Sequence, residues 1–168
     1  EIYDATYFPY TNYLRVGNGA EDITGFGQQY NIMAIFKPNE IYSLQYYINT
    51  ESTTTIDSQV GLGAFSSMSV NNAIGCDCPG TIQLINSQLV WLNSKYGVCT
   101  LASTNIQDER NVRLLSRNID HNAFSDLEGM LDWNNVEDTV SVDFDGKYFL
   151  ANPSTGKCYV WDYTLTIS

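Results

Sequence analysis

The chain has 168 residues, with 8 basic and 19 acidic side chains that give a formal net charge of −11. Nucleic acids and anionic lipids are bound through an excess of Lys and Arg, so this balance argues against both kinds of partner. Hydrophobic residues make up 43% and aromatic residues 13% of the chain, which indicates a folded core rather than disorder. No apolar run approaches the roughly 20 residues that cross a bilayer, and residues 1–5 lack the features of a signal peptide.

The first β-rich stretch combines residues 22–26, 32–36 and 41–47. Residues 32–36 are continuously apolar. Over residues 41–47, apolar and polar side chains alternate, which is the periodicity of a strand. The intervening Lys37-Pro38-Asn39-Glu40 has turn composition, so the two runs predict a hairpin. Residues 50–57 are rich in Ser and Thr and predict an exposed loop.

Two further stretches repeat this organisation. Each predicts three strands, and the two-residue links Asn86-Ser87 and Asp145-Gly146 are typical of tight hairpins. A fourth strand is expected in the second stretch at residues 111–116. The predicted strands are residues 81–85, 88–92 and 97–101 in one stretch and 139–144, 147–150 and 158–163 in the other.

The three stretches read as internal repeats when the strand centres Ile35, Trp91 and Phe149 are aligned. A β unit that recurs near 50 residues is typical of large propeller blades. The sequence therefore predicts an all-β fold of about three antiparallel meander units of propeller-blade type, an incomplete β-propeller, with a plain β-sandwich as the alternative. The predicted single domain spans residues 1–168, with units at about 1–70, 74–118 and 136–168.

One short helix is predicted between the second and third units. Residues 120–131 carry Phe124, Leu127, Met130 and Leu131 at helical spacing. Because a propeller needs 4–8 blades, three units predict one of three arrangements. The blades are unusual, the chain is part of a longer one, or a neighbouring chain completes the ring.

The four cysteines, Cys76, Cys78, Cys99 and Cys158, are expected to be reduced. Cys76 and Cys78 lie in Gly75-Cys76-Asp77-Cys78-Pro79-Gly80, where two thiolates could bind zinc together with Cys99, Cys158 or His121. One close pair without a second pair is not zinc spacing, so a tight Gly/Pro loop is the favoured interpretation. Whether the pair binds metal stays open, and no cofactor or metal site is predicted.

No complete catalytic constellation is present in the sequence, so no catalytic residues are predicted. His121 lacks a nucleophile motif, and Asp143-Phe144-Asp145-Gly146 fails as a calcium loop because Lys147 takes a ligand position. Acids that could serve as glycosidase carboxylates are better explained as a solvated face. These acids are Asp120, Asp126, Glu128, Asp132, Glu137, Asp138, Asp143 and Asp145.

Glycine and tryptophan patterns add two weaker hypotheses. Residues 17–19 and 25–27 are glycine-rich, but neither opens a helix after a strand, which argues against nucleotide binding. Trp91 and Trp161 lie inside strand patterns and are expected in the core. Trp133 is the best candidate for an exposed aromatic that stacks on a sugar.

Several motifs resemble blades of propeller-type structural proteins of tailed bacteriophages. Ile74-Gly75-Cys76 with Pro79-Gly80-Thr81-Ile82 is similar to the blade entry, residues 89–98 to its hairpin, and Leu115-Ser116-Arg117 to its downstream motif. The preceding unit is similar through Tyr7-Phe8-Pro9, residues 13–17, Asp22-Ile23-Thr24, Gln29-Tyr30-Asn31 and Ile35-Phe36-Lys37.

This resemblance implies a non-enzymatic component of a virion tail or neck, of the nozzle, hub or stabilisation type. The implied partners are other tail proteins and copies of the same chain in a ring, with a host surface glycan as a further possibility. The implied location is the virion, assembled in the bacterial cytoplasm. The alternative function is a carbohydrate-binding or carbohydrate-cleaving β domain, such as an adhesin or depolymerase.

Overall fold

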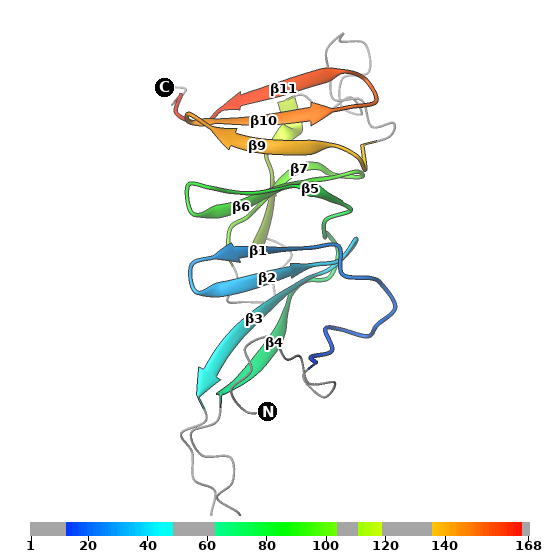
Figure 1. The fold of residues 1–168 in the computed structure, drawn as a ribbon, viewed down its shortest axis with the longest axis vertical. Coiled ribbons are helices and arrows are strands. Elements are labelled where there is room, and N and C mark those ends of the chain that lie inside the picture. Colours follow the sequence, from blue (N-terminus) through cyan, green and yellow to red (C-terminus); the bar gives the residue numbers. More distant parts are fainter. Residues whose placement is uncertain (1–12, 49–62, 104–110, 119–135, 166–168) are drawn as a thin grey trace, which may run out of the picture.

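The computed structural model describes residues 13–48, 63–103, 111–118 and 136–165, which form three antiparallel sheets (Figure 1). Sheet 1 contains β1 (Gly25–Gln29), β2 (Ile32–Phe36), β3 (Ile41–Ile48) and β4 (Gly63–Asn71). Sheet 2 contains β5 (Cys78–Ile85), β6 (Gln88–Asn93), β7 (Gly97–Leu101) and β8 (Val112–Leu114). Sheet 3 contains β9 (Val140–Phe144), β10 (Lys147–Asn152) and β11 (Lys157–Asp162).

Strands that follow one another in sequence are neighbours in every sheet, so each sheet is a meander. The predicted all-β class and the three predicted hairpins, β2–β3, β6–β7 and β10–β11, are confirmed. The fourth strand predicted at residues 111–116 is β8, whereas β4 was not predicted. The predicted helix at 120–131 and loop at 50–57 lie outside the described residues. Within the described part of the chain, no helix is long and apolar enough to cross a membrane.

The two-residue links close the hairpins as their composition predicts. Asp145 and Gly146 have φ angles of 49° and 72°, and Asn86 and Ser87 have φ angles of 48° and 65°. Positive φ at both central residues is the signature of the turn whose twist matches that of the flanking strands. These turns set the register of β5 on β6 and of β9 on β10.

The same turns give the true correspondence between the repeats and correct the predicted alignment by one residue. Counting from each two-residue turn, Ile35 of β2 corresponds to Trp91 of β6 and to Leu150 of β10, not to Phe149. A shift of one residue along a strand moves a side chain to the other face of the sheet. Leu150 is accordingly buried, while Phe149 lies on the opposite face.

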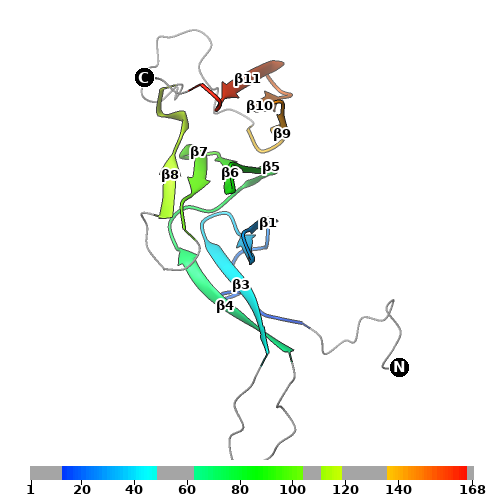
Figure 2. The ribbon, with the colours of Figure 1, turned by 90° about the vertical axis from the view of Figure 1, so that its left-hand side faces the viewer.

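The sheets are stacked face to face, with sheet 2 between sheets 1 and 3 (Figure 2). In each sheet we call the face toward the sheet 1 end of the stack the lower face and the opposite one the upper face. One core lies between the upper face of sheet 1 and the lower face of sheet 2, where Phe36 contacts Trp91 with ring centroids 5.0 Å apart. The other core lies between sheets 2 and 3 and includes Val90, Leu92, Tyr148 and Leu150.

Buried polar side chains join neighbouring sheets and fix their relative position. Gln29 of sheet 1 donates from Nε2 to the Leu101 carbonyl (3.2 Å) and accepts at Oε1 from the Leu89 N–H (2.9 Å). Between sheets 2 and 3, the Tyr148 hydroxyl and the Ser141 hydroxyl each donate to the Thr81 carbonyl at 2.9 Å. Directional bonds of this kind set one packing register, which apolar contacts alone leave free.

Candidate assembly interface

The buried cysteines do not come together as a zinc site. Cys76 and Cys99 lie in the core between sheets 1 and 2, whereas Cys78 lies in the core between sheets 2 and 3. Burial raises the pKa of the Cys76 and Cys99 thiols to about 12 and also raises that of Cys78, so these groups remain protonated at neutral pH. Cys158 is exposed, and all four cysteines are free. Among the described residues no cluster of His, Cys, Asp and Glu could hold a metal ion.

The loop around these cysteines is held by Asp77 and Gly75. The Asp77 carboxylate accepts hydrogen bonds from the Ser94 N–H (2.9 Å) and from the Ser94 hydroxyl. The Gly75 carbonyl accepts from Trp91 Nε1 (2.8 Å) and Asn93 Nδ2 (3.0 Å). The segment Gly75–Gly80 is thus a structural loop that ties the start of β5 to the end of β6 and the β6–β7 turn.

Four of the eight acids singled out in the sequence, Asp120, Asp126, Glu128 and Asp132, lie outside the described residues, as do His121 and Trp133. Of the acids that are described, Asp143 lies on the lower face of sheet 3 and accepts a hydrogen bond from the Tyr163 hydroxyl at 2.7 Å. That bond, more than burial, raises the pKa of Tyr163. Asp145 is in the β9–β10 turn. Glu137 and Asp138 are exposed in the segment that precedes β9.

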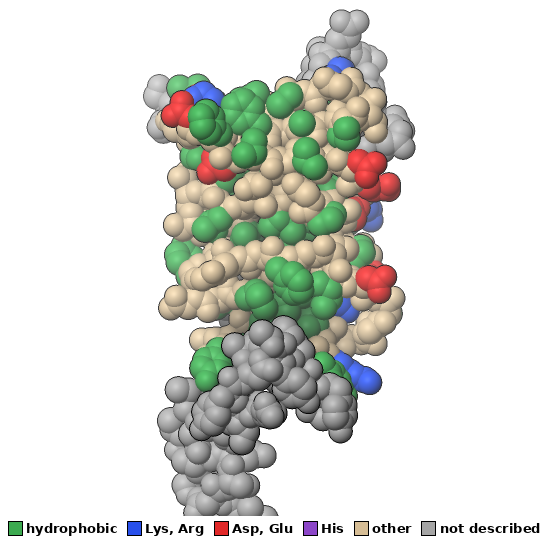
Figure 3. Space-filling view, viewed as in Figure 1, with side chains coloured by type: hydrophobic (Ala, Val, Ile, Leu, Met, Phe, Trp, Pro, Cys, Tyr) green, Lys and Arg blue, Asp and Glu red, His purple; other side chains and the backbone are tan. Residues whose placement is uncertain are grey.

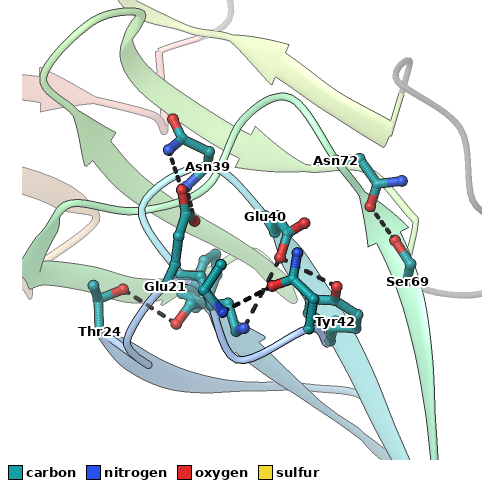
Figure 4. Close-up of polar contacts among 11 residues, drawn as sticks. Glu21, Thr24, Asn39, Glu40, Tyr42, Ser69 and Asn72 are labelled. Carbon is teal, nitrogen blue, oxygen red and sulfur yellow. Dashed lines mark hydrogen bonds and ion pairs between the residues drawn. The ribbon is translucent and has the colours of Figure 1, made fainter. Parts of the chain in front are cut away.

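A second polar group surrounds the β2–β3 turn (Figure 4). Asn39 donates from Nδ2 to Glu21 Oε1 (2.6 Å), and the Tyr42 hydroxyl donates to Glu40 Oε2 (3.1 Å). The buried Lys37 ammonium lies 4.0 Å from the same Glu40 oxygen and 5.7 Å from the centre of the Tyr42 ring. Desolvation, and then the bond to Glu40, raise the pKa of Tyr42. This group anchors the segment before β1 to the turn.

Gly25 and Gly27, from the glycine-rich residues 25–27, allow two sheets to pack closely. A Cβ on Gly25 would lie 2.6 Å from Ile82 Cδ1, and one on Gly27 would lie 2.6 Å from Leu89 Cδ2. Their absence of side chains lets β1 approach β5 and β6 of sheet 2.

A cavity of about 470 Å³ opens between sheets 2 and 3 beside β11. Most of its lining is apolar, although Ser116 and Asp162 contribute polar groups. Trp161, expected in the core, is instead partly exposed at this cavity and contacts Tyr163 with ring centroids 5.7 Å apart. Trp91, in contrast, is buried as expected. Other lining residues include Val98, Leu115, Tyr148, Leu150, Tyr159 and Leu165.

The upper face of sheet 3 is an exposed apolar surface, and hydrophobic side chains gather over β9–β11 in Figure 3. Val142, Phe149 and Val160 form a row across its three strands because they are paired in register. Val140 and Phe144 flank this row on β9, and both are exposed. Apolar faces of this kind on soluble proteins mark interaction surfaces.

The lower face of sheet 1, at the other end of the stack, is also apolar. Phe26, Met33, Tyr46 and Phe65 are exposed there, and Tyr46 contacts Phe65 with ring centroids 5.3 Å apart. Neither surface is predicted from the sequence, because apolar residues inside strand patterns are expected in the core. The alternation Val140-Ser141-Val142-Asp143-Phe144 showed that one face of β9 is apolar, but only packing shows which face is covered.

The two apolar end faces form the candidate functional site of the described chain. Either could receive another sheet, because each resembles the faces that are buried inside the stack. No protein-family model matches the chain, and no curated protein is detectably similar to it in sequence.

Proposed function

We propose that this chain is a non-enzymatic structural module of a bacteriophage or prophage tail or neck, and that its three sheets are consecutive blades of a propeller-type structure. The motifs around Gly75–Gly80 and Leu115–Arg117 motivate the family. The blade arrangement is supported by the first strands of the sheets, since β1 contacts β5 and β5 contacts β9. In a propeller, the first strands of successive blades are neighbours around the central channel.

The observation that carries an assembly function is the pair of apolar faces at the two ends of the stack. A soluble monomer rarely leaves large apolar side chains such as Phe144 and Phe65 together on exposed sheet faces. Another protein surface would remove them from water and gain the hydrophobic free energy of burial. The polar side chains Asp77, Tyr148 and Asp143, in contrast, form hydrogen bonds within the fold.

The test is detection of the chain in particles. Antibodies raised against the recombinant protein would be applied to purified virions, or to induced prophage particles, from the bacterium that encodes it. We expect gold label at the tail or neck in electron micrographs and the protein in the particle proteome. Particles from a strain lacking the gene are the control. Intact, fully assembled tails in that strain, together with absence of the protein from wild-type particles, would refute the proposal.

Carbohydrate binding is the second candidate, and the residue that favours it is Trp161. Its exposed ring, next to Tyr163, could stack on a sugar. The cavity beside it offers few hydrogen-bonding groups, however, and sugar recognition depends on such groups. A glycan array distinguishes the two functions: binding that is lost in Trp161→Ala and kept in Tyr30→Ala, an exposed aromatic away from the cavity, would favour the carbohydrate function.

A further inference from the structure

We propose that the upper face of sheet 3 in one copy of the chain packs against the lower face of sheet 1 in a second copy, head to tail. This inference rests on the proposed assembly function and names its partner and its two surfaces. The argument comes from the repeats themselves, because several residues of sheets 1 and 3 are exposed although their counterparts in the other sheets are buried.

The upper face of sheet 3 carries residues whose counterparts are buried. Phe144, Ile85 and Gln29 each precede the two-residue turn of their sheet and are therefore equivalent. Ile85 and Gln29 are 3% and 0% exposed because the next sheet covers them, whereas Phe144 is 70% exposed. Val160 is likewise exposed, while its counterparts Thr100 and Ser43 are buried.

The lower face of sheet 1 shows the converse. Met33 is equivalent to Leu89 and to Tyr148, which are both 2% exposed because the preceding sheet covers them. Met33 is 36% exposed, and Phe26, on the same face, is exposed as well. Ile35 on this face is 2% exposed, as buried as its counterparts Trp91 and Leu150, so the exposed part of the lower face is the part formed by Phe26, Met33, Tyr46 and Phe65.

Within the stack, an upper face always meets a lower face. Sheet 1 meets sheet 2 in this way, and sheet 2 meets sheet 3. The end of one copy therefore offers the surface that the beginning of another copy is built to receive. Of the surfaces described here, the lower face of sheet 1 is the matching partner of the upper face of sheet 3.

The distribution of charge permits this contact despite the net charge of −11. The strand residues of the lower face of sheet 1, from Phe26 and Gln28 to Ser69, are all uncharged, and the Lys37 ammonium beside Tyr42 is buried next to Glu40. On the upper face of sheet 3 the charged side chains are Lys147 and Asp162, which pair at 3.6 Å. Two copies can approach through these faces without placing like charges opposite one another, an arrangement that would otherwise oppose association.

A head-to-tail contact uses two different surfaces and is heterologous, so it forms a closed ring when the rotation between copies divides a full turn. Each copy would contribute three sheets, and the sheet order would continue across the boundary between copies. We therefore expect a discrete oligomer in which both end faces are buried.

The experiment uses single lysine substitutions in exposed strand positions, which tolerate a long polar side chain. Val142→Lys alters the upper face of sheet 3, and Met33→Lys alters the lower face of sheet 1. Leu114→Lys is the matched control, because Leu114 is 49% exposed and lies on β8, away from both end faces. Circular dichroism checks that each variant is folded, and analytical ultracentrifugation with light scattering gives the mass.

We expect the wild type and Leu114→Lys to form the same oligomer, and each end-face variant to require at least tenfold higher concentration to associate. An equimolar mixture of Val142→Lys and Met33→Lys should form a one-to-one dimer, because each variant keeps the intact face that the other needs. Only a head-to-tail interface predicts this complementation.

Four results would overturn the inference: a wild type that stays monomeric at high concentration, a Met33→Lys variant that still dimerises by itself, loss of association in Leu114→Lys, or a mixture that stays monomeric. The second of these would indicate pairing of two sheet 3 faces. A chain that is found in virions but fails this experiment leaves the proposed function standing without this interface. A chain that forms the oligomer but is absent from particles supports this interface and contradicts the proposed function.

Discussion

At the scale of single residues, the core of this protein is notable for three buried thiols. Cys76, Cys78 and Cys99 are each 0% exposed and behave as small apolar side chains within the two cores. Their protons remain bound in the folded state over a wider pH range than in the unfolded chain. Stability is therefore linked to pH in the alkaline range.

We predict that the free energy of unfolding falls as pH rises above 9. Unfolded thiols ionise near their ordinary pKa of 9.0, whereas Cys76 and Cys99 ionise only near 12 when folded. The folded state then binds more protons, and each thiol lowers stability by about 1.4 kcal/mol per pH unit. Urea titrations in reductant between pH 8 and 10.5 measure this slope.

The Cys99→Ala variant should show a shallower slope, because one of the linked thiols is gone. Cys158→Ala removes an exposed thiol and is the matched control. A slope that is identical in Cys99→Ala and in the wild type would contradict the linkage, whatever the absolute stability of the variant.

We also predict that EDTA leaves the melting temperature unchanged. A bound metal stabilises the folded state by mass action, so its removal would lower the melting temperature. Cys76 and Cys78 lie in different cores and do not share a site. Calorimetry of the protein as purified, with and without chelator, is the measurement. A decrease of several degrees, restored by added zinc, would revive the metal hypothesis.

At the scale of elements, the loop before β5 and the β2–β3 turn are in direct backbone contact. The Cys76 N–H donates to the Lys37 carbonyl at 2.8 Å. A Cβ on Gly75 would lie 1.9 Å from that carbonyl oxygen and 2.7 Å from the Glu40 nitrogen. Backbone atoms cannot move aside as the end of a side chain can, so glycine is required here.

We predict that Gly75→Ala destabilises the protein by at least about 2 kcal/mol, because overpacking must separate the two loops. Gly27→Ala is the comparison: its Cβ would meet only the end of the Leu89 side chain, which can change rotamer. Chemical denaturation of both variants gives the difference. Equal losses of stability in the two variants would show that the contact with the turn is not what requires Gly75.

At the scale of the whole molecule, sheet 2 belongs to both cores because its two faces are buried. Leu89 and Trp91 lie on its lower face and Val90 and Leu92 on its upper face. Neither sheet 1 nor sheet 3 contacts the other core, so sheet 2 couples them. Unfolding should consequently be a single cooperative transition through the stack.

We predict that Leu92→Ala, which creates a cavity between sheets 2 and 3, lowers stability by about 2–4 kcal/mol and reduces protection throughout the stack. Hydrogen exchange followed by mass spectrometry should show faster exchange in β2 of sheet 1 as well as in β10. Loss of protection confined to β9–β11 would indicate that the sheets unfold independently.

Local patterns predicted most of the strands. Alternation defined β3 and β9, and the Asn86-Ser87 and Asp145-Gly146 links defined the β5–β6 and β9–β10 hairpins. These signals depend on neighbouring residues alone. Strand β4 was missed because its small residues, including Ser66, Ser67 and Ser69, do not alternate clearly with apolar ones. The alignment of the repeats on Phe149 was wrong by one residue, because similarity between strand sequences does not show which side chains are buried.

The sequence by itself determined the all-β class, the three meanders and the turns that close them, since each follows from composition and periodicity over a few residues. Only the tertiary structure decided which apolar faces are covered. Val90 and Val142 look alike in sequence, yet one is buried by sheet 3 and the other is exposed at the end of the stack. Burial depends on which sheets follow one another in space, and this is information that no single strand contains.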